Sequence, residues 1–227
     1  MVEAFLESGA KVYATGTDFQ VLNELNESEK LKSKPIEYLY LDFTSPDSVN
    51  DCLEILSKLD RIDVLVNNAG VNKIDTIDEI MDEDWDWINT VNLRGPFVVT
   101  KALAKKMKEQ KSGKVVSVSS IFGVVSKEKR AAYSTTKWGL IGLTKAIALD
   151  LAPYNILANA VSPGFVDTEL TRRVLGDKGI DELVGRIPQQ RLANCKEIAK
   201  TVLFLASEHN TYITGQNIIV DGGFTSA

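Results

Sequence analysis

Short runs of apolar and β-branched residues recur along the chain and constrain its fold more than any other feature. Between these runs lie stretches with the length and the apolar spacing of amphipathic helices. Runs that are apolar on both faces are typical of strands buried in a parallel sheet, because helices cover both faces of such a sheet. The expected strands are residues 11–15, 36–41, 62–66, 114–118, 156–161 and 216–220.

The alternation of strands and helices predicts the α/β class, with a doubly wound parallel sheet of the Rossmann-like kind and right-handed crossovers. A length of 227 residues suits one domain, so we expect a single domain over residues 1–227. In such sheets, ligands bind at the carboxyl ends of the strands. Functional residues are therefore expected directly after the apolar runs.

Three stretches carry the clearest helix signals. Ser45 and Pro46 are typical of the first positions of a helix, and the apolar face that follows contains Cys52, which we expect to be a structural thiol. Residues 82–111 predict a helix that is interrupted at Pro96. Residues 131–151 predict an unbroken helix.

The composition excludes several classes of protein. No apolar run is long enough to cross a membrane. Two cysteines and one histidine exclude a disulfide scaffold and a Cys/His zinc cluster. A net charge of -5 argues against a nucleic-acid partner. We therefore expect a soluble, cytoplasmic protein with no metal site and with neither nucleic acid nor a membrane as its partner.

Tyr133 and Lys137 lie four residues apart in a helical stretch, so both side chains project from one face. A phenol has a pKa of about 10 in water, and an ammonium group beside it lowers that pKa. Ser119 and Ser120 follow the expected strand 114–118, where a hydroxyl is able to hydrogen-bond a substrate carbonyl. The pattern indicates acid–base chemistry on a carbonyl or alcohol oxygen.

Other segments match one known family in order and spacing. They are Asn67-Asn68-Ala69-Gly70, Val91-Asn92-Leu93, residues 162–168, residues 213–216 and residues 220–223. With Ser120, Tyr133 and Lys137, they make the chain resemble the short-chain dehydrogenase/reductase family over essentially its whole length. The resemblance implies an NAD(P)-dependent oxidoreductase that transfers a hydride between nicotinamide and a carbonyl or secondary alcohol.

The family's catalytic roles carry over to four residues of this chain. Tyr133 is expected to be the general acid/base, and Lys137 is expected to lower the pKa of Tyr133 and to hold the ribose hydroxyls. Ser120 is expected to orient the substrate oxygen, whereas Ser119 should face the other way. Asn92 is expected to hold a water molecule; the alternative is an amide that packs the helix.

The resemblance also implies a set of cofactor contacts. Asp42 is expected to bond the adenine amino group with the backbone of Phe43 beside it; the alternative for Asp42 is an acidic flank of the following helix. The residues expected along the rest of the cofactor are Asn68, Ala69 and Gly70 at the adenosine ribose, Pro163 and Gly164 at the nicotinamide end, and Val166 and Thr168 at the carboxamide and the phosphates.

The choice between NAD and NADP depends on the residues after the second family strand. Gly16 leaves room for a 2′-phosphate and Thr17 is able to bond it, which favours NADP. Asp18 favours NAD if it turns inward, because a carboxylate bonds the ribose hydroxyl and repels a phosphate. The sequence leans slightly toward NADP.

The chain departs from the family at its beginning. Residues 1–12 resemble the rear half of the first helix, ending at Gly9, and no first strand or T-G-x-x-x-G-x-G turn precedes them. Three explanations are open. The natural start lies upstream; the sheet reorganises around the gap and binds the cofactor weakly; or the protein is non-catalytic and oligomerises, for example with a full-length relative.

Substrate and partners are predicted only broadly. Residues 168–190, with Arg172 and Arg173, are expected to form a substrate lid, or else an ordinary surface helix. The nearest resemblance is to 3-oxoacyl-acyl-carrier-protein reductases, which implies a substrate linked to an acidic carrier protein. Lys111 and the basic segment 127–130 agree with such a carrier, whereas Tyr154 stands where a second basic residue is expected. A sugar or polyol would serve equally well as the substrate. The family implies a homotetramer or dimer formed through residues 90–110, residues 131–151 and the last strand.

Overall fold

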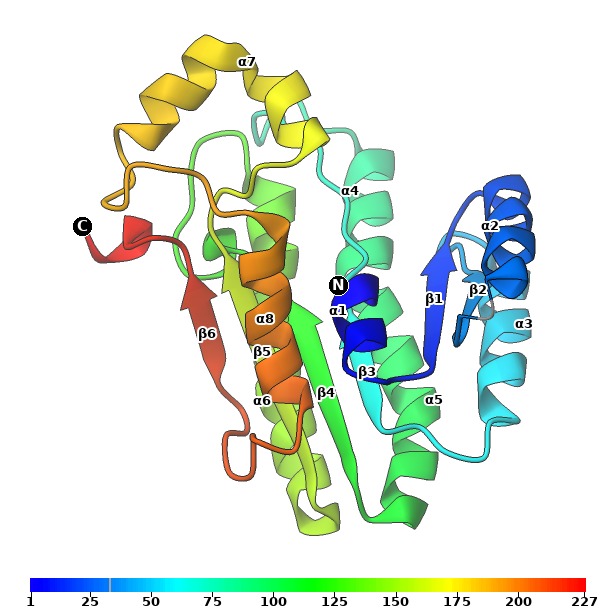
Figure 1. Ribbon diagram of the computed structural model, residues 1–227. Coiled ribbons are helices and arrows are strands. Elements are labelled where there is room, and N and C mark those ends of the chain that lie inside the picture. The colour runs from blue at the N-terminus through cyan, green and yellow to red at the C-terminus, as the bar shows by residue number, and fades with distance from the viewer. Residues whose placement is uncertain (33) are drawn as a thin grey trace. The chain divides into compact units, whose positions relative to one another are not determined.

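All the described strands pair in parallel, which confirms the α/β class, but they form two sheets in place of one. The first sheet pairs β1 (Val12–Gly16) with β2 (Ile36–Tyr40). The second sheet contains, in this order, β3 (Val64–Asn67), β4 (Gly113–Val118), β5 (Ile156–Pro163) and β6 (Asn217–Val220) (Figure 1). The strands coincide closely with the apolar runs of the sequence.

The computed structural model describes residues 1–32 and 34–227. Its contacts group into an N-terminal unit, Met1–Asp60, and a C-terminal unit, Arg61–Ala227. Among the described residues, β1 has a ladder only with β2, and β3 has one only with β4. Each of these two strands therefore lies at one edge of its own sheet among the described residues. The single domain predicted over residues 1–227 stays a prediction.

The N-terminal unit contains α1 (Val2–Glu7), α2 (Phe19–Leu31) and α3 (Pro46–Ser57). α1 precedes β1, and Gly9 between them has a φ of 81°, a left-handed conformation that glycine adopts without strain. Ser45 caps α3 as predicted, because its side chain accepts a hydrogen bond from the N–H of Ser48. Cys52 is buried on this helix, as expected.

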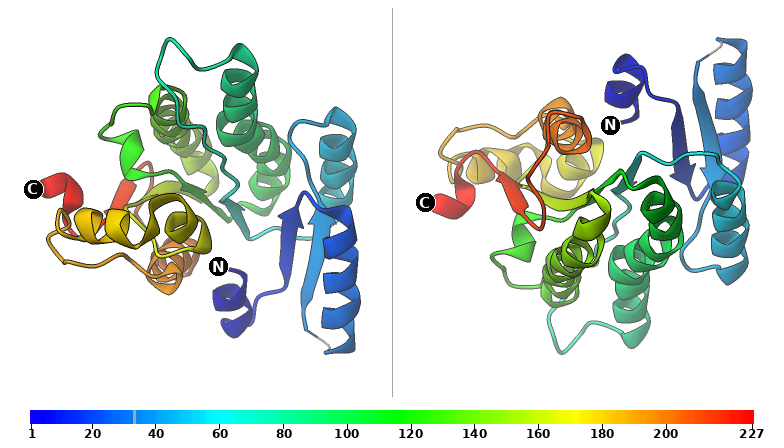
Figure 2. Two further views of the ribbon diagram at one scale, coloured as in Figure 1. Left: turned by 90° about the horizontal axis from the view of Figure 1, so that it is seen from above. Right: turned by 90° about the horizontal axis from the view of Figure 1, so that it is seen from below.

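In the C-terminal unit, helices cover both faces of the four-stranded sheet. α4 (Asp82–Asn89), α5 (Gly95–Gln110) and α6 (Ala131–Leu151) lie on one face, and α8 (Cys195–Ala206) lies on the other (Figure 2). Strand residues with no contact with solvent fill the space between them, namely Val116, Ile156, Ala158, Ala160 and Val161. Short 3-10 segments complete the unit: η2 (Ile121–Gly123), η3 (Ala152–Tyr154) and η4 (Phe224–Ser226).

The helix predicted over residues 82–111 is interrupted, and the interruption lies just before Pro96. α4 ends at Asn89, a π-helical segment called η1 (Thr90–Arg94) follows, and α5 then begins at Gly95. Pro96 lies in the first turn of α5. The N–H of Gly95 bonds the main-chain oxygen of Thr90, five residues back, so the π-type bonding reaches the residue directly before Pro96. The interruption predicted at Pro96 is therefore the π-helical segment directly before it.

The predicted lid contains α7 (Glu169–Val184). Gly176 inside it has φ 62° and ψ 174°, which kinks the helix, and this conformation is essentially confined to glycine. The role of a lid stays a prediction. Among the residues that the structure describes, none of the helices combines the length and the apolarity that a bilayer-spanning segment requires.

Candidate active site

Tyr133 and Lys137 lie one turn apart near the beginning of α6. The Nζ atom of Lys137 is held at the end of the sheet, because it donates a hydrogen bond of 3.0 Å to the main-chain oxygen of Val118, the last residue of β4. The same atom lies over the Tyr133 ring, 5.6 Å from its centroid. The structure therefore brings the two residues together at the carboxyl end of β4, as the sequence predicts.

Burial acts on both groups and disfavours their charged forms. It lowers the pKa of Lys137 from 10.5 to about 8, and it raises the pKa of Tyr133 above its ordinary value. A hydrogen bond with Ser120 and the positive charge of Arg130 oppose this rise in the pKa of Tyr133. We predicted that Lys137 lowers the pKa of Tyr133; in this structure the groups that act to lower it are Ser120 and Arg130.

The two serines after β4 have different roles. Ser120 begins η2, and its Oγ accepts a hydrogen bond of 3.2 Å from the N–H of Phe122. Its side chain also lies near enough to Tyr133 to lower the pKa of that phenol. Ser119 donates its Oγ proton to the main-chain oxygen of Lys137, 3.0 Å away. Ser119 therefore fixes the backbone of α6, and Ser120 is the hydroxyl beside the phenol.

Asn92 lies in η1 and is completely buried. Its Oδ1 accepts from the N–H of Val71 at 2.8 Å, and its Nδ2 donates to the main-chain oxygen of Val71 at 2.9 Å. Nδ2 also donates to Oγ1 of Thr136, 3.1 Å away on α6. The protein itself engages this amide, as the packing alternative predicts. The water-holding role of Asn92 stays a prediction.

Two glycines expected at the cofactor lie close to other groups, Gly70 tightly and Gly164 so closely that a side chain has no room. A Cβ atom on Gly70 would lie 3.3 Å from Nζ of Lys137. A Cβ atom on Gly164 would lie 2.7 Å from the Cα of Asp221, which is too close for any real contact. Asn68 and Ala69, which precede Gly70, are exposed in the loop after β3, and Pro163 ends β5.

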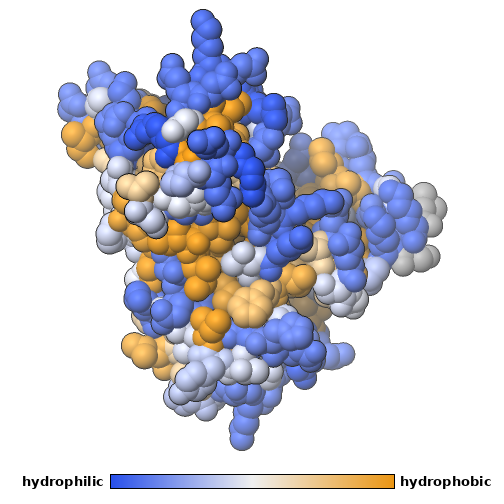
Figure 3. Space-filling model, turned by 60° about the vertical axis from the view of Figure 1, so that its left-hand side comes forward, coloured by the Kyte–Doolittle hydropathy of each residue, from blue (hydrophilic) through white to orange (hydrophobic). Residues whose placement is uncertain are grey.

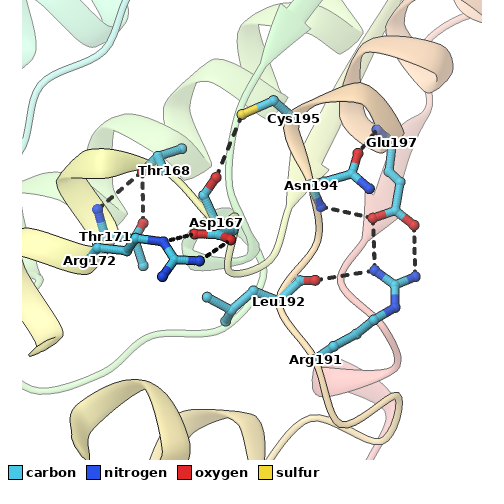
Figure 4. A network of polar contacts seen from close by, with 9 residues as sticks. All are labelled: Asp167, Thr168, Thr171, Arg172, Arg191, Leu192, Asn194, Cys195 and Glu197. Atoms are coloured by element: carbon cyan, nitrogen blue, oxygen red, sulfur yellow. Dashed lines mark hydrogen bonds and ion pairs between the residues drawn. The ribbon is translucent and has the colours of Figure 1, made fainter. Parts of the chain in front are cut away.

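The segment after Gly164 is held by polar contacts at the beginning of α7 (Figure 4). Val166 pairs with Ala193 in an isolated parallel bridge. Thr168 caps α7, since its Oγ1 accepts from the N–H of Thr171 at 3.1 Å. Arg172 donates two hydrogen bonds of 2.6 Å to the carboxylate of Asp167. The positions predicted for the carboxamide and phosphate contacts are therefore fixed by their own neighbours.

A second cluster fixes the beginning of α8 (Figure 4). Asn194 caps this helix, and the Glu197 side chain returns a bond to the N–H of Asn194, which makes a capping box. Arg191 binds both carboxylate oxygens of Glu197, at 2.8 and 2.7 Å, and lowers the pKa of Glu197 to about 2. This surface pair sets the direction of the chain from residue 191 into α8.

The remaining predicted cofactor residues belong to the N-terminal unit. Gly16 ends β1, and Thr17 is exposed beside it. Asp18 caps α2, because its Oδ1 accepts from the N–H of Val21 at 3.0 Å. Asp42 accepts from both the N–H and the hydroxyl of Thr44, at 2.8 and 2.7 Å, so it lies in the turn before α3 as the alternative reading predicts. Phe43 follows it and is half-buried.

The chemistry of the C-terminal unit fits the nicotinamide half of a dinucleotide. An ammonium group has three donors, and one protein acceptor, the main-chain oxygen of Val118, is recorded for Lys137. Donors therefore remain for the hydroxyls of a ribose. Gly70 leaves the backbone bare beside this group, whereas the backbone of Gly164 is packed against Asp221.

Sequence reasoning missed two residues that belong to this constellation. Thr136 receives the amide proton of Asn92 and donates its own hydroxyl to the main-chain oxygen of Tyr133 at 2.8 Å. Phe122 meets the Tyr133 ring edge to face, with centroids 6.3 Å apart. Arg130 was noticed only as part of a basic segment. Their positions within three residues of Ser120 or Tyr133 were the one available signal.

Comparisons with known proteins agree with this geometry. Residues 1–225 match the family described as enoyl-(acyl carrier protein) reductase. The chain is 39% identical to the 3-oxoacyl-acyl-carrier-protein reductase FabG of Thermotoga maritima, covering 96% of this chain and 89% of the relative. It is 34% identical to the cyclopentanol dehydrogenase of Comamonas testosteroni, with coverage of 96% and 88%.

A solved structure gives the same result. The gluconate 5-dehydrogenase of Burkholderia cenocepacia, in complex with NADP and tartrate, superposes with a TM-score of 0.92 at 31% identity, over 99% of this chain and 89% of that one. All three relatives are named for oxidoreductase activities. The fold, the matched residues and these relatives together show that the chain belongs to the short-chain dehydrogenase/reductase family.

Proposed function

We propose that the protein transfers a hydride between a nicotinamide cofactor and a carbonyl or secondary alcohol, with Tyr133 as the general acid/base. The observation that carries this proposal is the convergence of three side chains at the end of β4. Lys137 is held by the last residue of that strand, Ser120 follows the strand, and Ser120 lies near enough to Tyr133 to lower its pKa. The bound cofactor supplies or accepts the hydride.

The residues of the chain handle the proton. In the direction of reduction, Ser120 and the Tyr133 hydroxyl hydrogen-bond the carbonyl oxygen, and Tyr133 donates its proton to that oxygen as negative charge develops there. The raised pKa of Tyr133 keeps the phenol protonated at neutral pH, which suits a proton donor. Lys137, with a pKa of about 8, orients the ribose and exchanges its own proton near the working range.

The preferred cofactor is proposed to be NADP. The relative from Burkholderia cenocepacia binds NADP, and the Asp18 side chain of this chain is engaged as the cap of α2. Because Oδ1 of Asp18 accepts this bond, it is not free to bond the ribose hydroxyl of NAD. The adenosine contacts predicted for Asp42 and Phe43, and the selectivity predicted for Gly16 and Thr17, stay predictions.

The test is a pair of measurements on the 227-residue chain, cofactor binding by titration with NADPH and NADH and turnover of a ketone panel. Tyr133→Phe is expected to reduce kcat by about 10²- to 10⁴-fold, because general acid–base catalysis contributes that much. Its cofactor affinity is expected to stay within a few-fold of the wild type. Tyr212→Phe, which removes a hydroxyl from a fully exposed tyrosine, is the matched control and is expected to change neither quantity.

Two results would contradict the proposal. Absence of NADPH and NADH binding up to millimolar concentration would favour the non-catalytic alternative. Turnover that survives in Tyr133→Phe would show that another group supplies the proton. Tighter binding of NADH than of NADPH would reverse the cofactor assignment and leave the chemistry unchanged.

A carrier-linked 3-oxoacyl group is one candidate substrate, supported by the name of the Thermotoga maritima relative. Lys111, the basic residue expected to meet an acidic carrier, ends α5 in a left-handed conformation with φ 52°. Tyr154 lies under Lys108, whose Nζ is 4.7 Å from the ring centroid. The test is reduction of the 3-oxo group of a carrier-linked 3-oxoacyl thioester and of the same thioester without the carrier. A lower KM for the carrier-linked form, and loss of this difference in Lys111→Glu, would support this partner.

Self-association is the other proposed interaction. Large apolar side chains on α5 and α6 face solvent, among them Phe97, Trp138 and Leu149. A groove of about 660 Å³ runs beside Phe97, lined by residues of α4, η1, α5 and α6. Figure 3 shows a further hydrophobic patch on the side of the molecule it presents. We expect a dimer or tetramer by light scattering, and a smaller species for Trp138→Glu.

A further inference from the structure

Among the residues that the structure describes, the Arg130 side chain has buried polar atoms beside the candidate active site that lack a hydrogen-bond partner. Arg130 lies directly before α6, three residues from Tyr133. Its Nε and Nη1 atoms are buried, and neither has a hydrogen-bond partner among the residues that the structure describes. Buried polar groups are almost always hydrogen-bonded, so two buried donors on one cation require an explanation.

Neighbouring acids do not provide it. A guanidinium group is always charged in proteins and offers five donors, and a buried charge is normally paired. Glu128 acts on Arg130 only through its field, because its exposed carboxylate pairs with Lys127 at 3.5 Å. Within the described part of the chain, no carboxylate lies within ion-pair distance of Arg130.

Arg130 is placed close to the reacting atoms. Its Cζ lies 5.7 Å from the centroid of the Phe122 ring, and this ring meets Tyr133 edge to face at 6.3 Å. The charge of Arg130 is near enough to Tyr133 to lower the pKa of its hydroxyl. An acceptor bound by Arg130 therefore lies within a small molecule's length of the oxygen that Tyr133 protonates.

Aromatic rings line the region beyond Phe122. Phe122 meets Phe165 at 6.3 Å, and Phe165 meets Phe224 at 5.1 Å, both edge to face. These rings come from η2, from the segment after β5 and from η4. They give the region an apolar wall in which a charged partner of Arg130 is only weakly screened by water.

We propose that Arg130 binds an anionic group of the substrate, a carboxylate or a phosphate, so that the protein acts on an anionic ketone or secondary alcohol. The proposal rests on the function proposed above and names the substrate class of that same site. An oxyanion supplies the acceptors that Nε and Nη1 lack. It also explains why a cation is retained in a half-buried place that a neutral side chain would fill at lower cost.

The experiment compares two matched pairs of substrates in reduction by NADPH. Acetoacetate is compared with methyl acetoacetate, and dihydroxyacetone phosphate with dihydroxyacetone. The measured quantity is the ratio of kcat/KM for the anionic member to that for the neutral member. A change in the pKa of Tyr133 affects both members of a pair, so it cancels in this ratio. The pair with the larger ratio in the wild type identifies the anion.

Three variants complete the design. Arg130→Met keeps the aliphatic stem and removes the charge, and it is expected to lower the ratio at least about ten-fold for the preferred pair. Arg130→Lys keeps a point charge and is expected to recover part of the ratio. Lys129→Met removes the neighbouring charge from an exposed side chain and is expected to change the ratio less than about two-fold.

Thermal unfolding separates binding from a purely structural role. If Arg130 served only to hold Phe122, Arg130→Met would unfold at a lower temperature than the wild type. The proposal expects an equal or higher temperature, because an unpaired buried charge is removed. An unchanged ratio in Arg130→Met, an equal fall in Lys129→Met, or a wild type that prefers the neutral member of both pairs would overturn it.

The outcomes for the two proposals remain distinct. Turnover of neutral ketones that depends on Tyr133, without preference for the anions, would leave the proposed function standing and reject the role of Arg130. If the wild type reduces none of the four compounds, calorimetry with acetoacetate and dihydroxyacetone phosphate on the NADPH-loaded protein tests the anion site directly. Binding that is lost in Arg130→Met would support the anion site, and no binding of either anion would reject it.

Discussion

Polar side chains at the predicted site positions are used differently in the two units. In the C-terminal unit, two of them bind residues that are remote in sequence: Asn92 bonds Thr136 across 44 positions, and Lys137 bonds Val118 across 19. Ser120 and Thr168 bond neighbours two and three positions away. In the N-terminal unit, Asp18 bonds a neighbour three positions away, and Asp42 bonds one two positions away. Long-range contacts assemble the candidate active site, whereas short-range contacts build turns and helix caps.

This difference implies that the two groups of residues respond differently to substitution. A remote contact forms only when the whole C-terminal unit is folded, so its loss is felt as a change in global stability. A local cap affects one helix end. The predictions below are ordered by the size of the effect that this contrast implies.

The largest expected effect is that of Asn92→Leu. It leaves the N–H and the main-chain oxygen of Val71 without their partner, and two such groups cost about 4 kcal/mol of unfolding free energy. Denaturant unfolding measures this change. Asn89→Leu is the matched control, because the Asn89 amide donates to the main-chain oxygen of Trp85 in its own helix, and we expect less than about 1 kcal/mol for it. Equal losses in both variants would contradict the contrast.

The next effect is a pH dependence due to Lys137. Its pKa falls from 10.5 in the unfolded chain to about 8 in the folded protein. Below about pH 8 both states are protonated and burial of the charge destabilises the fold in full. Between about pH 8 and 10.5 the unfolded state binds more protons, so this destabilisation is relieved as the pH rises, by about 3 kcal/mol in all.

Lys137→Met removes this dependence. We expect the unfolding free energy of the wild type, measured relative to that of Lys137→Met, to rise across pH 8 to 10 and to stay constant below pH 7.5. The difference between the two proteins isolates Lys137 from other groups that titrate in this range. A flat difference would show that Lys137 is hydrated in the folded protein.

A smaller effect is expected for Thr136→Val, which keeps the shape of the side chain and removes the acceptor for Asn92. Loss of this buried bond is expected to lower the unfolding free energy by about 2 kcal/mol. Thr136→Ser restores the hydroxyl and is expected to recover most of the loss. If Thr136→Ser is as unstable as Thr136→Val, the methyl group and not the bond to Asn92 is responsible.

The smallest effect is expected for Asp18→Ala in the N-terminal unit. Removal of a helix cap costs about 1 kcal/mol, and here it affects the beginning of α2 alone. Hydrogen exchange should increase at the first turn of α2 and stay unchanged at β4 and α6. Faster exchange in the C-terminal unit would show that the two units are energetically coupled.

The same contrast explains how much the sequence could predict. Ser45 was identified as a helix cap, and α6 was predicted with its observed bounds, because both depend on neighbouring residues. The motif around Tyr133 was identified for the same reason. Tertiary contacts pair Asn92 with Val71 and bury Nε and Nη1 of Arg130. No local sequence pattern predicts either feature.

The interruption of the helix at residues 82–111 shows how far such reasoning reaches. A proline is the strongest helix breaker in a sequence, so the break was placed at Pro96. The structure accommodates Pro96 in the first turn of α5 and has the irregularity at Thr90–Arg94. A π-helical turn has no residue type of its own, so the sequence indicates the region of the interruption but not its form.

The π-helical segment also works as a phase shift between two helices. Each residue of an α-helix advances the side chains by about 100°, so one extra residue rotates everything after it by that angle. The apolar periodicity of α4 and that of α5 therefore differ in phase. If the periodicity of α4 is continued into α5, it predicts that the wrong side chains of α5 face the sheet. Protein engineers who shorten, idealise or graft this region need to preserve the added residue, because deleting it would turn α5 about its own axis.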